Sequence, residues 1–260
     1  MPIQAVEPRR LYRRIADQIG ALIYSGEFAP GKRLPPERNL AQQFGVSRPS
    51  VREALIALEI AGLVDVRVGS GIYVREASAA AALTRRAMPG GPDQPDPGPL
   101  EVLRARWLIE GEIAALAASH AREADLDAIR DTLFTMAEEN ARGGGTQEAD
   151  RLFHLRVAEA SGNSALALVV RGLWDQRAGP MYAKFEQHFS SPKLRAQSLT
   201  DHQAIFASLE KRDSRGARAA MRRHLNRVFK EFSQAWKHST RHTGAEVLVH
   251  DRRNDMNIVL

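Results

Sequence analysis

Residues 28–74 read FAPGKRLPPERNLAQQFGVSRPSVREALIALEIAGLVDVRVGSGIYV, and this stretch decides the fold of the first part of the chain. Pro36 stands where the first turn of a helix accepts proline, and apolar side chains follow it at helical spacing. Gly45 ends that short helix, and Ser47 is placed to cap a second helix that runs to about Ala61. Two short helices joined by such a turn form a helix-turn-helix.

The pattern changes from helical to extended after the second helix. Leu63–Val68 and Ile72–Val74 are rich in β-branched residues, and the glycines Gly69 and Gly71 between them predict a tight hairpin. An amphipathic helix at Leu11–Tyr24 precedes both short helices. Three helices followed by a hairpin predict a winged helix.

The start of the second short helix carries side chains suited to DNA. The N-terminal part of a recognition helix reaches base edges in the major groove, where arginine can donate two hydrogen bonds to guanine. Serine hydroxyls and the helix N-terminus suit phosphate, and a glycine in the wing allows close approach to the duplex. The expected DNA contacts are Arg38, Ser47, Arg48, Ser50, Arg52 and Gly69. A plain helical hairpin with exposed arginines is the alternative interpretation.

Charge and composition exclude several classes of protein for this chain. The net charge is +6, and residues 1–75 carry 11 lysines and arginines against 7 acidic residues, which favours a polyanionic partner for this part. The chain has no cysteine, which excludes a disulfide scaffold, a cysteine-ligated metal and a thiol nucleophile. No apolar run reaches the roughly 18 residues of a membrane span, and the N-terminus lacks the apolar core of a signal peptide. We therefore expect a cytoplasmic protein without membrane contact.

A proline-rich stretch divides the chain. Met88–Leu100 reads MPGGPDQPDPGPL and holds five of the 13 prolines, a density that neither helix nor strand tolerates. Just before it, Ser78–Leu83 is alanine-rich and predicts a short helix. We place a winged-helix domain at residues 1–76, an alanine- and then Pro/Gly-rich linker at 77–100, an all-helical domain at 101–239 and a tail at 240–260.

The part after the linker shows helical periodicity and no strand pattern. The expected helices are Leu100–Arg122, Leu126–Asn140, Gln147–Ala160, Ala165–Gln176, Met181–Phe189, Pro192–Lys211 and Ser214–Lys237. The predicted fold class is mainly α: a winged helix-turn-helix followed by an all-α antiparallel helical bundle.

Histidine placement in the bundle indicates a metal site. Asp150 and His154 are four residues apart in one predicted helix and share a face, while His202 and His224 fall in two later helices. One carboxylate and three imidazoles suit a divalent ion, zinc first, with nickel and manganese as alternatives. Spacing by itself leaves open that these are ordinary core or surface histidines.

The stretch 28–74 closely resembles the winged-helix domain of GntR-type bacterial transcription regulators. The resemblance rests on the motifs P-G-x-x-L-P-P-E-R, V-S-R-x-x-V-R-E-A-L and G-x-G. It implies that Arg38, Arg48 and Arg52 contact operator DNA and that Gly69 lies near the minor groove.

Residues 101–236 resemble the helical effector domain of the FadR-type branch of these regulators. The motifs that carry this resemblance are Asp150-x-x-x-His154, Ala160-Ser161-Gly162-Asn163, His202-x-x-Ile205 and Met221-x-x-His224-Leu225. It implies that Asp150 and the three histidines hold a divalent metal at the floor of a cavity that accepts small carboxylates. Members that bind fatty-acyl-CoA lack this cage, so we do not expect an acyl-CoA effector.

Three residues are expected to contact the effector: Arg106, Asn163 and Arg177. Arginine is a second binding group for an anion, and Arg106 matches the R-x-x-x-E helix whose arginine points into the pocket of the family. Asn163 and Arg177 are polar side chains that can satisfy hydroxyl groups. Ordinary ion pairs are the alternative for both arginines. Over roughly residues 10–236 the chain is similar to repressors of hexuronate utilisation, which implies a sugar-acid effector.

These observations predict a homodimeric, non-enzymatic repressor that reads a palindromic operator and leaves it when a sugar acid binds. A metal-dependent enzyme acting on small hydroxy or sugar acids is one alternative, although the spacing shows no general base. An activator with the same architecture is another, because the sign of regulation depends on where the operator lies.

Overall fold

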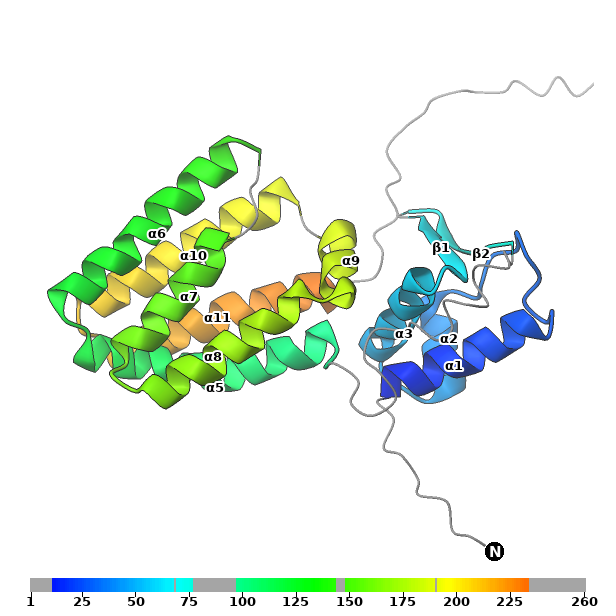
Figure 1. Ribbon diagram of the computed structural model, residues 1–260, viewed down its shortest axis with the longest axis horizontal. Helices are drawn as coiled ribbons and strands as arrows, with labels where there is room; N and C mark the ends of the chain where they lie inside the picture. The colour runs from blue at the N-terminus through cyan, green and yellow to red at the C-terminus, as the bar shows by residue number, and fades with distance from the viewer. Residues whose placement is uncertain (1–10, 68, 77–96, 144–147, 190, 234–260) are drawn as a thin grey trace, which may run out of the picture.

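The computed structural model describes residues 11–67, 69–76, 97–143, 148–189 and 191–233, which form a winged part and a helical bundle (Figure 1). The predicted helix at Ser78–Leu83, most of the linker and the tail at 240–260 lie outside the described residues. No helix in the described part of the chain is both long enough and apolar enough to cross a membrane.

The winged part has the predicted order of elements. They are α1 (Leu11–Tyr24), α2 (Glu37–Phe44), α3 (Arg48–Ile60), β1 (Val64–Arg67) and β2 (Gly71–Val74). The strands pair antiparallel, with Val64 opposite Val74. Gly45 takes the left-handed conformation that ends α2, and the Ser47 hydroxyl accepts a hydrogen bond from the Ser50 backbone N–H at the start of α3. The sequence therefore predicted both ends of the turn between α2 and α3.

The second part is all helical, as predicted. Its elements are α5 (Pro99–His120), α6 (Glu123–Ala141), α7 (Glu148–Ala160), α8 (Ser164–Asp175), a 3-10 turn η1 (Gln176–Ala178), α9 (Pro180–Phe189), α10 (Pro192–Glu210) and α11 (Ser214–Ser233). The long helices α5 and α11 lie side by side, and α10 packs against both α6 and α11 (Figure 1). Helix α5 begins at Pro99, inside the stretch assigned to the linker, because proline fits the first helical position.

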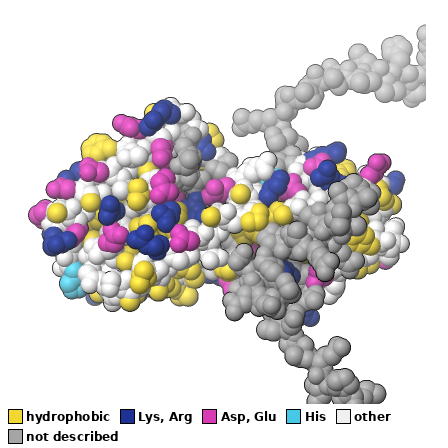
Figure 2. Space-filling model, viewed as in Figure 1, with side chains coloured by type: hydrophobic (Ala, Val, Ile, Leu, Met, Phe, Trp, Pro, Cys, Tyr) yellow, Lys and Arg dark blue, Asp and Glu magenta, His cyan; other side chains and the backbone are white. Residues whose placement is uncertain are grey.

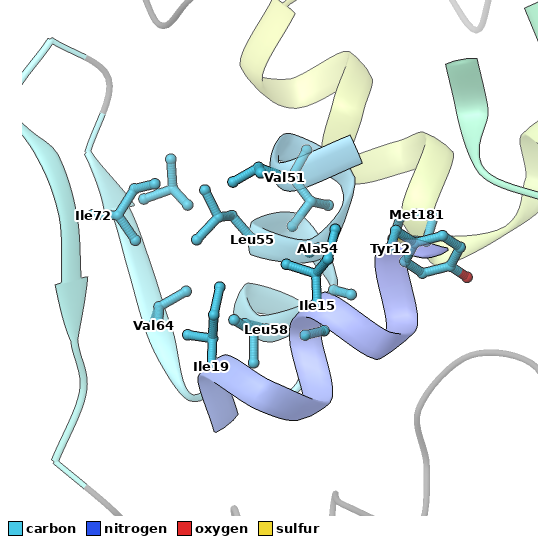
Figure 3. Packing of buried hydrophobic residues seen from close by; sticks show 14 of the residues in the cluster. Tyr12, Ile15, Ile19, Val51, Ala54, Leu55, Leu58, Val64, Ile72 and Met181 are labelled. Atoms are coloured by element: carbon cyan, nitrogen blue, oxygen red, sulfur yellow. The ribbon is translucent and has the colours of Figure 1, made fainter. Parts of the chain in front are cut away.

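One hydrophobic core runs from the winged part into the bundle. Tyr12 of α1 packs beside Met181 of α9 (Figure 3). The same cluster holds Phe185 and Phe232. A second cluster fills the bundle between α5, α6, α7, α10 and α11. Helix α9 thus belongs to the core that α1 and α3 build, and it joins the two parts.

The surface in Figure 2 shows basic and acidic side chains interspersed over the bundle. Many of these charges are paired, as Arg218 is with Glu112 at 2.7 Å. Exposed pairs of this kind contribute little to stability.

Candidate metal centre and nucleic-acid interface

The four predicted metal ligands converge at one place in the bundle. Helix α7 supplies Asp150 and His154, α10 supplies His202, and α11 supplies His224, with ligand atoms all within 4.8 Å of one another. Nε2 of His202 lies 3.2 Å from Nε2 of both His154 and His224. Asp150 Oδ1 lies 3.5 Å from Nε2 of His202, and it is buried without a hydrogen-bond partner among the described residues. A buried, unpartnered carboxylate oxygen facing three imidazole nitrogens fits a divalent cation.

A second set of side chains orients the imidazoles. The Nδ1 atoms of the three histidines face Glu110, the Met136 sulfur and Asp201 respectively. Glu110 Oε2 is in close contact with Nδ1 of His154, and Asp201 Oδ2 lies 3.4 Å from Nδ1 of His224. A partner at Nδ1 leaves Nε2 free to bind metal. The sequence pointed to the four candidate ligands but to none of these orienting residues.

Burial and neighbouring side chains both shift the pKa values of the site. It lowers the pKa of His202 well below its usual value, and the neighbouring His224 adds to this effect. Burial also lowers the pKa of His224, although the hydrogen bond to Asp201 acts in the other direction. Burial tends to raise the pKa of Asp150, but the nearby His202 and Arg177 outweigh it and lower the pKa. Neutral imidazoles and an ionised carboxylate are the forms that bind a metal ion.

A cavity adjoins two of the four candidate ligands, Asp150 and His224. Asp150, His224, Arg106 and Arg177 line it together with Tyr182 and Glu186 of α9. Arg106 is only 3% exposed, and its Nε donates to Glu110 at 2.6 Å. Its Nη2 is buried and has no hydrogen-bond partner among the described residues. An unsatisfied guanidinium N–H beside a candidate metal site is suited to a carboxylate.

The other two predicted effector contacts have different outcomes. Arg177 lines the cavity but is already paired, with Asp150 at 3.1 Å and closely with Glu186. Asn163 does not line this cavity; its exposed side chain instead caps α8 by accepting from the Ala165 and Leu166 N–H groups. The prediction of an effector contact at Asn163 does not fit this placement, because its oxygen is used by the helix end.

Three of the six predicted DNA contacts line a cleft between the hairpin and the N-terminal ends of α2 and α3. The cleft includes Arg38, Arg48 and Gly69, and also Arg33 and Arg67, which the sequence analysis did not single out. The Arg48 side chain is 43% exposed, with Nε 3.4 Å from Glu37. Ser47 and Ser50 lie beside each other at the exposed start of α3, with their hydroxyls 2.9 Å apart.

Arg52 is placed differently from the other predicted DNA contacts. It is 0% exposed, and its guanidinium donates to both Glu37 oxygens, with Nη2 2.8 Å from Oε1. Its Nη1 donates at 2.6 Å to the Phe232 carbonyl at the end of α11. Burial lowers the pKa of Arg52, and the Glu37 carboxylate opposes that effect. In this arrangement of the two parts Arg52 faces the helical bundle, and its contact with DNA stays a prediction that requires these bonds to break.

Helix α9 lies between the cavity and α3. Tyr182 and Glu186 line the cavity, whereas His188 Nε2 lies 2.7 Å from Glu59 of α3. Lys184 lies 3.6 Å from the same carboxylate. The sequence marked α9 only as a helix, because its contacts with Glu59 join residues more than 100 positions apart.

The two parts match two known sequence families. Residues 11–74 match the bacterial regulatory proteins of the gntR family, and residues 101–227 match the FCD domain. The chain therefore belongs to the gntR family of bacterial regulatory proteins and carries an FCD domain. It is a DNA-binding transcription regulator and not an enzyme.

Several relatives align over most of the chain. The Uxu operon transcriptional regulator of Escherichia coli is 40% identical over 86% of this chain and 87% of its own length. The Exu regulon transcriptional regulator of Escherichia coli is 37% identical over 86% of this chain and 84% of its own length. Among solved structures, E. coli McbR/YncC is 23% identical and aligns over 86% of this chain and 97% of that one, with a TM-score of 0.45.

Proposed function

We propose that this chain is a homodimeric repressor whose helical domain binds a hexuronate-like sugar acid beside a divalent metal and then releases the operator. The observation that carries the proposal is the unpartnered Nη2 of Arg106 in the cavity that Asp150 and His224 also line. The similarity to the Uxu and Exu regulators supports a sugar acid as the class of effector.

The metal in this proposal is zinc, held by Asp150, His154, His202 and His224. When bound, it supplies a positive charge with positions open to a carboxylate and a neighbouring hydroxyl. Arg106 then binds a remaining oxygen of the effector. Polar groups of the cavity, among them Tyr182 and Glu186, contact its hydroxyls. An effector without hydroxyls leaves such buried groups unpaired and binds weakly.

The signal passes to the DNA-binding part through α9. Arg177 connects Asp150 to Glu186 on one side of α9, and Glu59 binds the other side. An effector anion competes with Asp150 and Glu186 for Arg177, so binding changes the position of α9 relative to α3. A coupling free energy of about 1–3 kcal/mol is enough for a useful switch.

The test starts by selecting a duplex from a random library and measuring its release. Glucuronate, galacturonate, fructuronate, lactate and a short fatty acid are each titrated against the complex. We expect at least one uronate to release the DNA. Release by lactate or the fatty acid with no effect of any uronate would refute the sugar-acid assignment and leave the regulator intact.

A matched pair of variants tests the role of Arg106. Arg106→Gln should abolish the response to the active uronate, because the cavity loses the guanidinium whose Nη2 has no hydrogen-bond partner among the described residues. Arg104→Gln removes the same charge from an exposed position of α5 and should respond like the parent. Equal responses of both variants would remove Arg106 from the effector site.

A further inference from the structure

We propose that Arg33 contacts the DNA backbone, held over Gly71 in the cleft between the hairpin and the recognition helix. The family assignment explains the arginines of α2 and α3 but not this one. Arg33 lies outside both helices and outside the two named strands. It nevertheless lines the cleft with Arg38 and Arg48.

The backbone of Arg33 is attached to the hairpin. Arg33 forms an antiparallel bridge with Tyr73 of β2. The Leu34 N–H donates to the Ile72 carbonyl at 2.8 Å, and the Val74 N–H donates to the Lys32 carbonyl at 2.9 Å. Because hydrogen bonds secure the chain on both sides of Arg33, its Cα is fixed relative to the wing.

The side chain of Arg33 lies against Gly71, the second glycine of the G-x-G motif. A Cβ at Gly71 would overlap the guanidinium and stand 2.9 Å from its Cζ. Carbon atoms approach one another only to about 3.5 Å without repulsion. Gly71 also has a φ of 130°, which side chains rarely adopt. Glycine at this position therefore leaves room for the Arg33 guanidinium.

The pairing of side chains in the cleft leaves the Arg33 guanidinium available to bind a ligand. Arg67 is paired with Asp65 at 2.8 Å, and its guanidinium lies 4.5 Å from the centre of the Tyr73 ring. Arg33 is exposed and has no ion pair or hydrogen bond from its side chain within the part of the chain that the structure describes. A cation whose backbone is fixed beside Arg38 and Arg48 in a DNA-binding domain is suited to phosphate.

The position of the cleft favours contact of Arg33 with DNA phosphates over contact with base edges. In the proposed complex, α3 acts as the recognition helix and enters the major groove, with the wing at the adjacent minor groove. The DNA backbone that separates these two grooves then passes over the cleft between α3 and the hairpin. Arg33 lies in that cleft.

The test measures binding to a random-sequence duplex by fluorescence anisotropy over a series of salt concentrations. Arg33→Gln should weaken binding about fivefold at about 0.15 M salt and reduce the slope of log affinity against log salt by about 0.9, the value for one lost phosphate contact. Arg33→Lys keeps the charge and should retain most of the slope. Arg215→Gln removes an exposed charge at the end of α11 remote from Phe232 and should behave like the parent.

Two results would overturn the proposal. One is an Arg33→Gln protein with the affinity and salt slope of the parent. The other is a loss confined to a selected operator sequence, with random DNA bound normally, because that pattern belongs to a base contact. Thermal unfolding of each variant checks that the fold is kept.

Discussion

Arg48 and Arg52 are four residues apart in α3, yet only one of them faces solvent. The Arg48 side chain is 43% exposed, whereas Arg52 is 0% exposed. In this arrangement Arg48 is the arginine of α3 that can reach a base edge. We expect Arg48→Ala to cost about 1–3 kcal/mol on a selected operator and much less on random DNA, because a bidentate contact to guanine is lost.

The control for Arg48 is Arg14→Ala, which removes an exposed arginine from α1 of the same part. Binding of both variants to both duplexes is measured at one salt concentration. Equal losses of Arg48→Ala on operator and random DNA would mean that Arg48 contacts only phosphate.

At the scale of elements, a metal ion would connect α7, α10 and α11. We expect purified protein to contain about one divalent ion per chain. Chelation should lower the Tm, because an ion that binds only the folded state stabilises by mass action, about 2.7 kcal/mol at a hundredfold excess over its Kd. Replacing both His202 and His224 by alanine should remove the ion and make the Tm insensitive to chelator.

His120→Ala is the matched variant for the metal experiment, since His120 is an exposed histidine at the end of α5. It should retain the metal of the parent. If elemental analysis finds no divalent metal in protein never exposed to chelator, the metal site is contradicted. The three histidines are then ordinary core residues.

Helix α9 carries a second prediction at this scale. Glu59→Gln removes the carboxylate that pairs with Lys184 and lies 2.7 Å from Nε2 of His188, both in α9. We expect uronate binding by calorimetry to be unchanged while release of DNA needs more uronate, because the contact between α9 and α3 is weaker. Glu138→Gln, an exposed carboxylate on α6, is the control. If Glu59→Gln releases DNA at the same uronate concentration as the parent, the contact between α9 and α3 does not transmit the signal.

For the whole molecule, we expect a dimer whose affinity for DNA falls linearly as log salt concentration rises. Two winged parts on a two-fold axis bind two half-sites, so each binding event displaces counterions from both. The oligomeric state is measured by size-exclusion chromatography at the protein concentrations that bind operator DNA. A monomer under those conditions contradicts the two-fold arrangement.

Local spacing allowed much of this protein to be predicted from its sequence. Caps, glycines and prolines located the helices, since these residues act within one turn of the chain. Asp150 and His154 share a face of α7 because a helix repeats every 3.6 residues. The resemblance supplied His202 and His224, which spacing by itself left open.

Other features could be decided only by the tertiary structure, because they depend on contacts between segments that are distant in the sequence. Arg52 matches a DNA-contact motif but is buried, because Glu37 and the Phe232 carbonyl satisfy its guanidinium. Glu110 orients His154 from another helix, and Arg33 lies over Gly71 of the neighbouring strand β2. A sequence determines which chemical groups exist and which face of a helix or strand they occupy. Packing decides which of those faces meet, because burial and charge pairing are properties of the whole folded chain.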